Sequence, residues 1–163
     1  MEQLHLILER GYGNDAEFLY EKGFDVTCID KSEKAKQYIN EKNKNIKVIV
    51  EEFEKMKFDN YDLIYSNLGI VFCNKLYIDK LLTIIKKCIN KDGFFVGNFL
   101  GKDDDWNDEN HSNIKFFNID EINEYFKDFK IFYIAEKKYI KDSSKEKDKH
   151  WHIIEIYAQK NID

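Results

Sequence analysis

The stretch that decides the fold is Leu6-Ile7-Leu8-Glu9-Arg10-Gly11-Tyr12-Gly13-Asn14, in which a short apolar run ends in a glycine-containing turn. A short helical stretch follows, and a second apolar run over residues 24–29 ends on Asp30. This order of strand, glycine turn, helix, strand and terminal acid is typical of the first unit of an open parallel sheet. In such a unit the glycines allow the turn to pass close to a ligand, and the acid can accept the hydroxyls of a ribose. The pattern therefore predicts a site for an adenosine-containing ligand.

The chain up to Gly101 continues this alternation of strands and helices. Ser32 is a suitable N-cap for a helix over residues 32–42, with Ala35, Tyr38 and Ile39 on its inner face. Further strands are predicted over residues 46–50, 61–65 and 94–100, and a further helix over residues 76–89, followed by a turn at residues 91–93. The last of these strands is almost wholly apolar, which suits the interior of a sheet that is covered on both faces.

After Gly101 an acidic loop leads to a short predicted helix over residues 119–126. Two strand-like runs remain, over residues 130–139 and 150–160, joined by a charged segment at 141–149 that we expect to be a solvated hairpin loop. Strands with a hairpin connection run antiparallel. The sequence therefore predicts an α/β protein with a Rossmann-like, doubly wound, seven-stranded mixed sheet, in which five parallel strands are followed by a terminal antiparallel pair.

Composition excludes several classes of protein. The 163 residues fit one domain over residues 1–163, and the net charge of −5 is spread along the chain, so no nucleic-acid footprint is expected. No apolar run approaches the ~20 residues of a membrane span, and no signal peptide is visible, so we expect no membrane contact and a cytoplasmic location. The three cysteines, Cys28, Cys73 and Cys88, are widely spaced in apolar contexts and are predicted to be buried free thiols of a reducing compartment.

Several segments resemble one known family, the class I S-adenosylmethionine-dependent methyltransferases. The matching segments are Glu9 with the following Gly-x-Gly (first motif), residues 26–30 (second motif), residues 61–66 (fourth motif) and residues 90–95 (the turn before strand five). Residues 97–101, Asp104-Asp105-Trp106 and Lys149-His150-Trp151-His152 are similar to a small bacterial subgroup near the tellurite-resistance-type methyltransferases. The resemblance covers nearly the whole chain and implies S-adenosylmethionine as cofactor and a small-molecule methyl acceptor.

The resemblance implies a set of cofactor-binding residues. It places Glu9, Gly11 and Gly13 at the methionine end, Asp30 and Lys31 at the ribose, Glu52 and Phe53 at the adenine, and Ser66 and Asn67 where strand four opens into the cleft. Structural alternatives remain open at several of these positions. The glycines also suit an ordinary tight turn, Asp30 suits the start of the following helix, and Glu51 is an alternative to Glu52 in a register shifted by one residue.

The acceptor side is predicted near the carboxyl end of strand five, where sheets of this kind bind ligands. Asp104, Asp105 and Trp106 are candidates there, although an acidic loop can equally be a solvated one. His150 and His152 share one strand face by alternation and could accept a proton or bind a metal, but a surface or core role is the stronger alternative. Since no third ligand stands at metal spacing, no metal is predicted.

Two departures from the family leave other functions open. The family loop usually has a third glycine, which is missing here, and the family's capping helices are missing because only residues 1–5 precede the first strand. We therefore expect an open cofactor face, covered by a second copy or another partner, or else a degenerate cofactor-binding module that acts as a regulatory or assembly partner. A nicotinamide-dependent oxidoreductase is disfavoured because Gly-x-Gly-x-x-Gly is absent.

Overall fold

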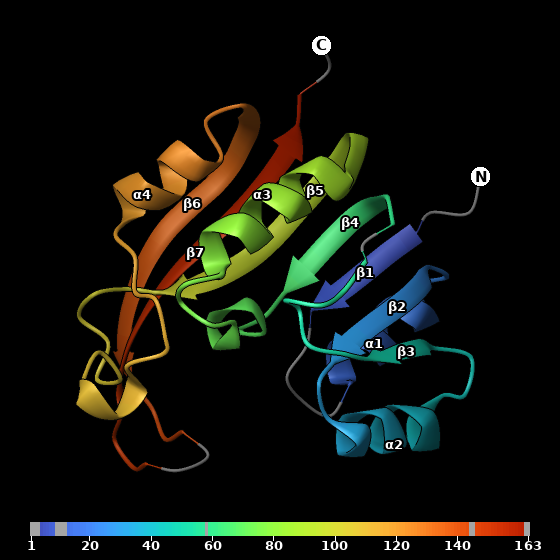
Figure 1. The fold of residues 1–163 in the computed structure, drawn as a ribbon, viewed down its shortest axis with the longest axis horizontal. Helices are drawn as coiled ribbons and strands as arrows, with labels where there is room; N and C mark the ends of the chain where they lie inside the picture. The colour runs from blue at the N-terminus through green and yellow to red at the C-terminus, as the bar shows by residue number, and fades with distance from the viewer. Residues whose placement is uncertain (1–3, 9–12, 58, 144–145, 162–163) are drawn as a thin grey trace.

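The computed structural model describes residues 4–8, 13–57, 59–143 and 146–161. Its centre is a seven-stranded sheet with the strand order β3-β2-β1-β4-β5-β7-β6 (Figure 1). The strands are β1 (Leu4–Leu8), β2 (Asp25–Asp30), β3 (Lys47–Val50), β4 (Tyr61–Ser66), β5 (Ile89–Leu100), β6 (Phe129–Ile140) and β7 (His150–Lys160). The helices are α1 (Asn14–Glu21), α2 (Glu33–Lys42), α3 (Ile78–Cys88) and α4 (Ile119–Tyr125), with short 3-10 turns η1 (Ile70–Phe72) and η2 (Glu109–His111).

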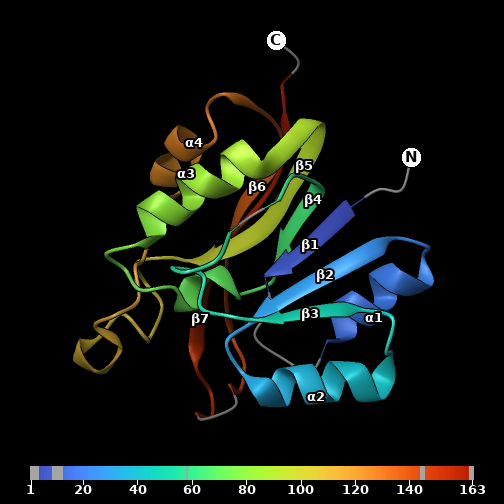
Figure 2. The same cartoon turned by 45° about the vertical axis from the view of Figure 1, so that its right-hand side comes forward.

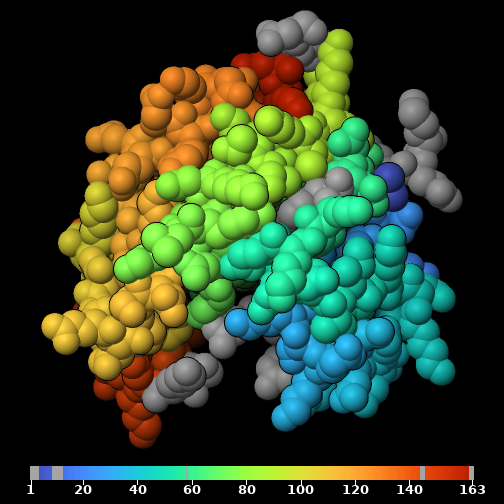
Figure 3. All heavy atoms as spheres, in the orientation of Figure 1, coloured from blue at the N-terminus to red at the C-terminus, as the bar shows by residue number. Residues whose placement is uncertain are grey.

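The direction of the strands confirms the predicted mixed sheet. Strands β3, β2, β1, β4 and β5 pair in parallel, whereas β7 runs antiparallel to both β5 and β6. The connection between β6 and β7 is therefore a hairpin, as the sequence predicted. The link between β3 and β4 contains no helix in its described part. In the space-filling view its atoms lie on the same side of the molecule as those of α3 (Figure 3).

The helices cover both faces of the sheet (Figure 2). Each face has its own apolar core. Helices α1 and α2 pack through Ala16 and Ile39 against one face. Helices α3 and α4 pack against the other face, where they meet the aromatic side chains of β5. Helix α3 alone buries Ile78, Leu81, Leu82 and Ile85. Because burial of each such side chain contributes about 1.5–3 kcal/mol, packing holds this helix more strongly than helical propensity does.

Helix α3 is shorter, and strand β5 begins earlier, than the sequence predicted. Helix α3 ends at Cys88, and Ile89 already pairs with Tyr61 of β4. Residues 91–93 form no separate turn, because they belong to an irregularity within β5 where the register against β4 shifts and Asp92 takes a left-handed φ of 62°. A side chain at Gly93 would lie 2.9 Å from the carbonyl oxygen of Asp62, so only glycine allows the two strands to approach this closely.

Two predictions for helix α2 are wrong. Tyr38 is exposed, whereas Ala35 and Ile39 are buried as predicted, so the buried side of the helix is narrower than the sequence indicated. Ser32 does occupy the N-cap position, but its side chain makes no capping hydrogen bond. The turn into the helix is instead stabilised by Asp30, whose Oδ1 accepts the Ser32 N–H at 2.8 Å.

Candidate functional site

The carboxyl ends of β1 to β5 lie along one edge of the sheet, which Figure 1 shows at the lower side of the ribbon. The strand order reverses between β1 and β4, because β2 and β3 lie on one side of β1 and β4 and β5 on the other. In open sheets of this kind a ligand binds outside the carboxyl ends at such a switch point. The predicted cofactor residues that the structure describes all lie at or next to these strand ends.

Asp30 is the last residue of β2, and its side chain is only 4% exposed. Its carboxylate accepts the Ser32 N–H, which fixes its orientation at the strand end. A carboxylate has about four lone-pair sites, so Asp30 can accept several hydrogen bonds at once. Lys31, which follows it, is exposed. A buried, oriented carboxylate at this position suits the two hydroxyls of a ribose.

The end of β3 brings the adenine candidates next to Asp30. The Glu51 N–H donates to the Asp30 carbonyl at 3.2 Å and so continues the pairing of β2 and β3 by one residue. Glu52 is exposed, and its carboxylate lies 2.6 Å from the Lys55 ammonium, which lowers the pKa of Glu52. Phe53 is half-buried against the core under α3. Both glutamates thus remain candidates, while Phe53 offers an apolar surface.

At the end of β4 the two predicted residues have different surroundings. Ser66 is fully buried, and its hydroxyl accepts the Ile70 N–H at 2.9 Å at the start of η1. Asn67 is exposed and is held by two side chains: its Oδ1 accepts from Asn98 Nδ2 at 3.0 Å, and its Nδ2 donates to Asp15 Oδ2 at 3.3 Å. Neither Asn98 nor Asp15 is among the residues predicted from the sequence to bind the cofactor. The only signal for them in the sequence is position: Asp15 follows β1, and Asn98 lies near the end of β5.

The glycine turn is described in part. Glu9 and Gly11 lie outside the described residues. Gly13 has a left-handed φ of 72°, and a side chain there would collide with Ile39 of helix α2. The structural reason for a glycine is therefore evident at this position, independently of any ligand.

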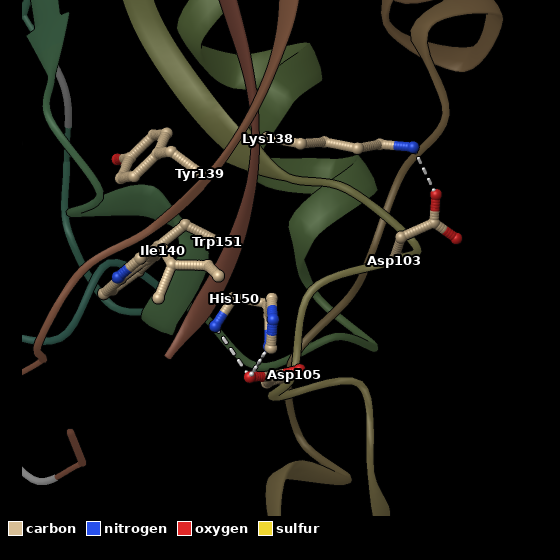
Figure 4. A pocket seen from close by; sticks show the side chains of 7 residues that line it. All are labelled: Asp103, Asp105, Lys138, Tyr139, Ile140, His150 and Trp151. Carbon is tan, nitrogen blue, oxygen red and sulfur yellow. Dashed lines mark hydrogen bonds and ion pairs between the residues drawn. The ribbon is translucent and has the colours of Figure 1, made fainter. Parts of the chain in front are cut away.

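A second feature lies beside the loop after β5. A cavity of about 370 Å³ is lined by Asp103, Asp105, Lys138, Tyr139, Ile140, His150 and Trp151 (Figure 4). These residues come from that loop, from the end of β6 and from the start of β7. In the close-up, Lys138 points toward Asp103 and His150 toward Asp105, whereas the three apolar side chains lie together on another side (Figure 4). The cavity thus contains two of the four predicted acceptor-side residues.

Asp105 and His150 form a dyad in this cavity. Asp105 Oδ2 accepts the backbone N–H of His150 at 2.7 Å and lies 3.1 Å from its ring Nδ1. These bonds from His150 lower the pKa of Asp105, the backbone bond most strongly. A carboxylate only accepts at neutral pH, so this geometry assigns the proton to Nδ1 and leaves Nε2 as an acceptor. The imidazole is 63% exposed. The dyad can therefore take a proton from a bound molecule.

Asp104 and Trp106 do not line the cavity, because both side chains are buried. Asp104 Oδ1 pairs with the Lys149 ammonium, and its Oδ2 accepts the His152 N–H at 3.0 Å. The Lys149 ammonium also lies over two indole rings, 4.7 Å from the centroid of Trp106 and 3.9 Å from that of Trp151. The prediction of a solvated segment over residues 141–149 is therefore wrong for Lys149, which is the buried centre of this cluster.

His152 has a core position. Its side chain is 5% exposed, its Nδ1 accepts the Asp103 N–H at 3.1 Å, and its ring fills the space where a side chain of Gly101 would lie. The alternative of a core role, which the sequence left open, thus describes His152. Among the residues with a described placement, no group of three or more His, Cys, Asp or Glu side chains is arranged to hold a metal ion. Likewise, no helix in those ranges is long and apolar enough to cross a membrane.

The strand order and the antiparallel strands at one end of the sheet define the fold of class I S-adenosylmethionine-dependent methyltransferases. Within that class the chain belongs to the family of tellurite resistance protein TehB, which its sequence matches over residues 4–150. Comparison with curated proteins finds no match.

Solved structures share this fold at low sequence identity. TehB from Haemophilus influenzae is 22% identical, with a TM-score of 0.85 over 98% of this chain and 58% of that protein. A SAM-dependent methyltransferase from Methanosarcina mazei is 15% identical, with a TM-score of 0.75 over 99% of this chain and 94% of that one. The 1,6-didemethyltoxoflavin-N1-methyltransferase of Burkholderia thailandensis, solved with its substrate and S-adenosylhomocysteine, is 15% identical, with a TM-score of 0.71 over 99% and 72%. This chain thus spans little more than half the length of TehB.

Proposed function

We propose that the protein binds S-adenosylmethionine and transfers its methyl group to a small-molecule acceptor. The observation that carries the proposal is Asp30, a buried and oriented carboxylate at the end of β2 beside the switch point of a methyltransferase fold. Membership in the TehB family supports the reaction class. The substrate-bound and S-adenosylhomocysteine-bound relative from Burkholderia thailandensis supports a small acceptor.

The polar and apolar groups at the sheet edge suit an adenosyl group. Asp30 accepts the ribose hydroxyls, with Lys31 beside it, and charge-assisted bonds of this kind are strong. Glu52, or Glu51 in the alternative register, accepts the adenine amino group, and Phe53 packs on the ring. The methionine half then extends over β1 toward β4, to Gly13, Ser66 and Asn67. Glu9 and Gly11 are its further candidates from the sequence, outside the described residues.

The cavity beside β7 is the acceptor pocket in this proposal. When bound, S-adenosylmethionine supplies an activated methyl group on a sulfonium sulfur, which leaves as a neutral thioether. Holding the acceptor in line with that methyl provides most of the catalysis. His150 Nε2 takes the proton that the acceptor loses, and Asp105 holds the imidazole in the required tautomer. Tyr139 and Trp151 provide apolar walls.

The proposed function also concerns a partner of the protein and its location in the cell. A second copy or another partner covers the cofactor and acceptor face, on the side where Tyr139 and Ile140 are exposed beside the cavity. The protein works in the cytoplasm, which agrees with the free thiols of Cys73 and Cys88. Light scattering with and without ligand tests for the partner, since a second copy would double the mass.

Titration calorimetry with S-adenosylmethionine, S-adenosylhomocysteine and NADH tests the function. We expect both adenosyl ligands to bind and NADH not to bind. Transfer of a labelled methyl group to a small molecule from a cell extract would then establish catalysis. Binding without transfer to any acceptor would favour the non-catalytic, regulatory alternative. Absence of binding would contradict the proposed function.

A further inference from the structure

Three side chains form a hydrogen-bonded chain across the switch point. The Leu68 N–H donates to Asn98 Oδ1 at 2.5 Å, Asn98 Nδ2 donates to Asn67 Oδ1 at 3.0 Å, and Asn67 Nδ2 donates to Asp15 Oδ2 at 3.3 Å. The direction of this chain is determined at both ends, because a backbone N–H can only donate and a carboxylate can only accept. Both carboxamides therefore have one permitted orientation, and the chain ends on the carboxylate of Asp15.

This hydrogen-bonded chain connects three parts of the fold that meet where a ligand is expected. Asp15 lies in the first turn of α1, Asn67 follows β4, and Asn98 lies near the end of β5. Leu68 has a left-handed φ of 59°, a conformation that costs a residue with a side chain of order 1–3 kcal/mol. The bond to Asn98 holds this strained backbone in place. Strain of this kind, fixed by a dedicated side chain, points to a requirement beyond folding.

The hydrogen-bonded chain of Asp15, Asn67 and Asn98 lies on the same face of the sheet as Asp30. Val26 and Cys28 of β2 face the core under α1 and α2, and alternation places Asp30 on that face. Tyr65 packs against the same core, so Asn67, two residues later, points to the same side. Since the adenosine half occupies the ends of β2 and β3 in the proposed function, the aminoacyl half extends past β1 toward Asp15 and Asn67.

We propose that Asp15 binds the α-ammonium group of the cofactor's aminoacyl half, and that Asn67 and Asn98 are positioning residues that hold Asp15 and the Leu68 backbone for it. The aminoacyl half carries an ammonium, which is a donor, and Asp15 is a half-buried carboxylate oriented by the Asn67 amide. A charge-assisted bond between them discriminates the intact cofactor from its adenosine part. This inference rests on the proposed function.

The test compares two ligands that differ only in the aminoacyl half. S-adenosylhomocysteine carries it, whereas 5′-methylthioadenosine ends in a methyl group. We expect Asp15→Asn to weaken S-adenosylhomocysteine binding about 10- to 100-fold, the range for a hydrogen bond to a charged group, while 5′-methylthioadenosine binding changes less than about twofold. Asn98→Ala should have the same selective effect, because it frees Asn67 and Leu68. Calorimetry gives both affinities, and thermal melting confirms that each variant is folded.

Glu17→Gln is the matched control. Glu17 lies in the same turn of α1 and loses the same charge, but its carboxylate faces Lys42 of α2 at 3.4 Å. The Glu17→Gln variant should bind S-adenosylhomocysteine and 5′-methylthioadenosine with the affinities of the parent protein. Equal weakening of both ligands by Asp15→Asn, or no weakening of either, would overturn this inference while the proposed function stands. If Asn98→Ala does not fold, Asp15→Asn still decides, since its amide oxygen can accept the Asn67 bond. A parent protein that binds neither ligand would overturn the proposed function and this inference together.

Discussion

Lys149 and Asp104 form an ion pair in which neither side chain is exposed to solvent. The two residues lie in loops that are 45 positions apart in the chain, and their contact joins the loop after β5 to the start of β7. The neighbours of Asp104 and Lys149 in the sequence, Asp105 and His150, line the cavity. The buried pair therefore holds the two loops that form the proposed acceptor pocket.

Removing one partner of this pair should destabilise the protein strongly. Lys149→Met leaves the Asp104 carboxylate buried without its cation, and loss of one partner of a buried pair costs about 3–5 kcal/mol. Urea unfolding at pH 7 measures the loss. Lys147→Met, which removes an exposed lysine from the same loop, should change the free energy of unfolding by less than about 0.5 kcal/mol. A Lys149→Met protein as stable as the parent would show that the pair contributes nothing.

Asp30→Asn should weaken S-adenosylhomocysteine binding by roughly 1.5–3 kcal/mol, the value of a hydrogen bond to a charged group. The substitution keeps an oxygen for the Ser32 N–H, so the melting temperature should change little. Calorimetry and thermal melting are the two measurements. Asp25→Asn, at the exposed opposite end of β2, serves as the control. Equal affinity of Asp30→Asn and the parent would remove the ribose assignment.

His150→Gln should reduce methyl transfer about 10²- to 10⁴-fold, the usual contribution of a general base. The affinity for S-adenosylhomocysteine should not change, because His150 lines the cavity beside β7 and not the end of β2. The control is His111→Gln, since His111 stacks on Trp106 and is bonded to Asp108 outside the cavity lining. Transfer to the acceptor found in the extract assay gives the rates. An unchanged rate in His150→Gln would leave the dyad without a catalytic role.

Stability should fall in alkaline solution. Burial, and then the nearby Glu54 carboxylate, raise the pKa of the Cys73 thiol from 9.0 to about 12. The unfolded protein therefore releases this proton at a lower pH than the folded protein does. The contribution of the Cys73 thiol to the free energy of unfolding is complete below pH 9 and is lost between pH 9 and 12. One such group gives a slope of about 1.4 kcal/mol per pH unit in that range. Urea unfolding between pH 7 and 10.5 measures it, and Cys73→Ala should reduce the slope. The same slope in both proteins would contradict the assignment.

Much of the fold could be predicted because its signals are local. Strand β7 spans residues 150–160 as predicted, since its apolar alternation and its flanking charged segments all lie within the strand and its connections. The position of β5 inside the sheet followed from its apolar run, which buries Phe95 and Phe99 on one face. The start of β5 was not predictable, because it depends on how Ile89 pairs with Tyr61, 28 residues away in the printed sequence.

The arrangement of the candidate site was predictable to a smaller extent, because it depends on contacts between distant parts of the chain. The order of elements predicted that Asp30 and Asn67 lie at the carboxyl edge of the parallel sheet, where the structure has them. The partners of those residues were not visible in the sequence. Asn98 meets Asn67 from another strand, and the burial of Lys149 requires two tryptophans and Asp104 to surround it.

The sequence by itself determined the order and type of the elements, the mixed sheet and the acid at the end of β2, since these follow from periodicity and turn residues within short stretches. Only the tertiary structure decided that Lys149 is buried, that Tyr38 is exposed, and that Asp15, Asn67 and Asn98 form one chain. The physical reason is that burial, and the hydrogen bonds that make it tolerable for polar groups, depend on residues brought together from distant parts of the chain.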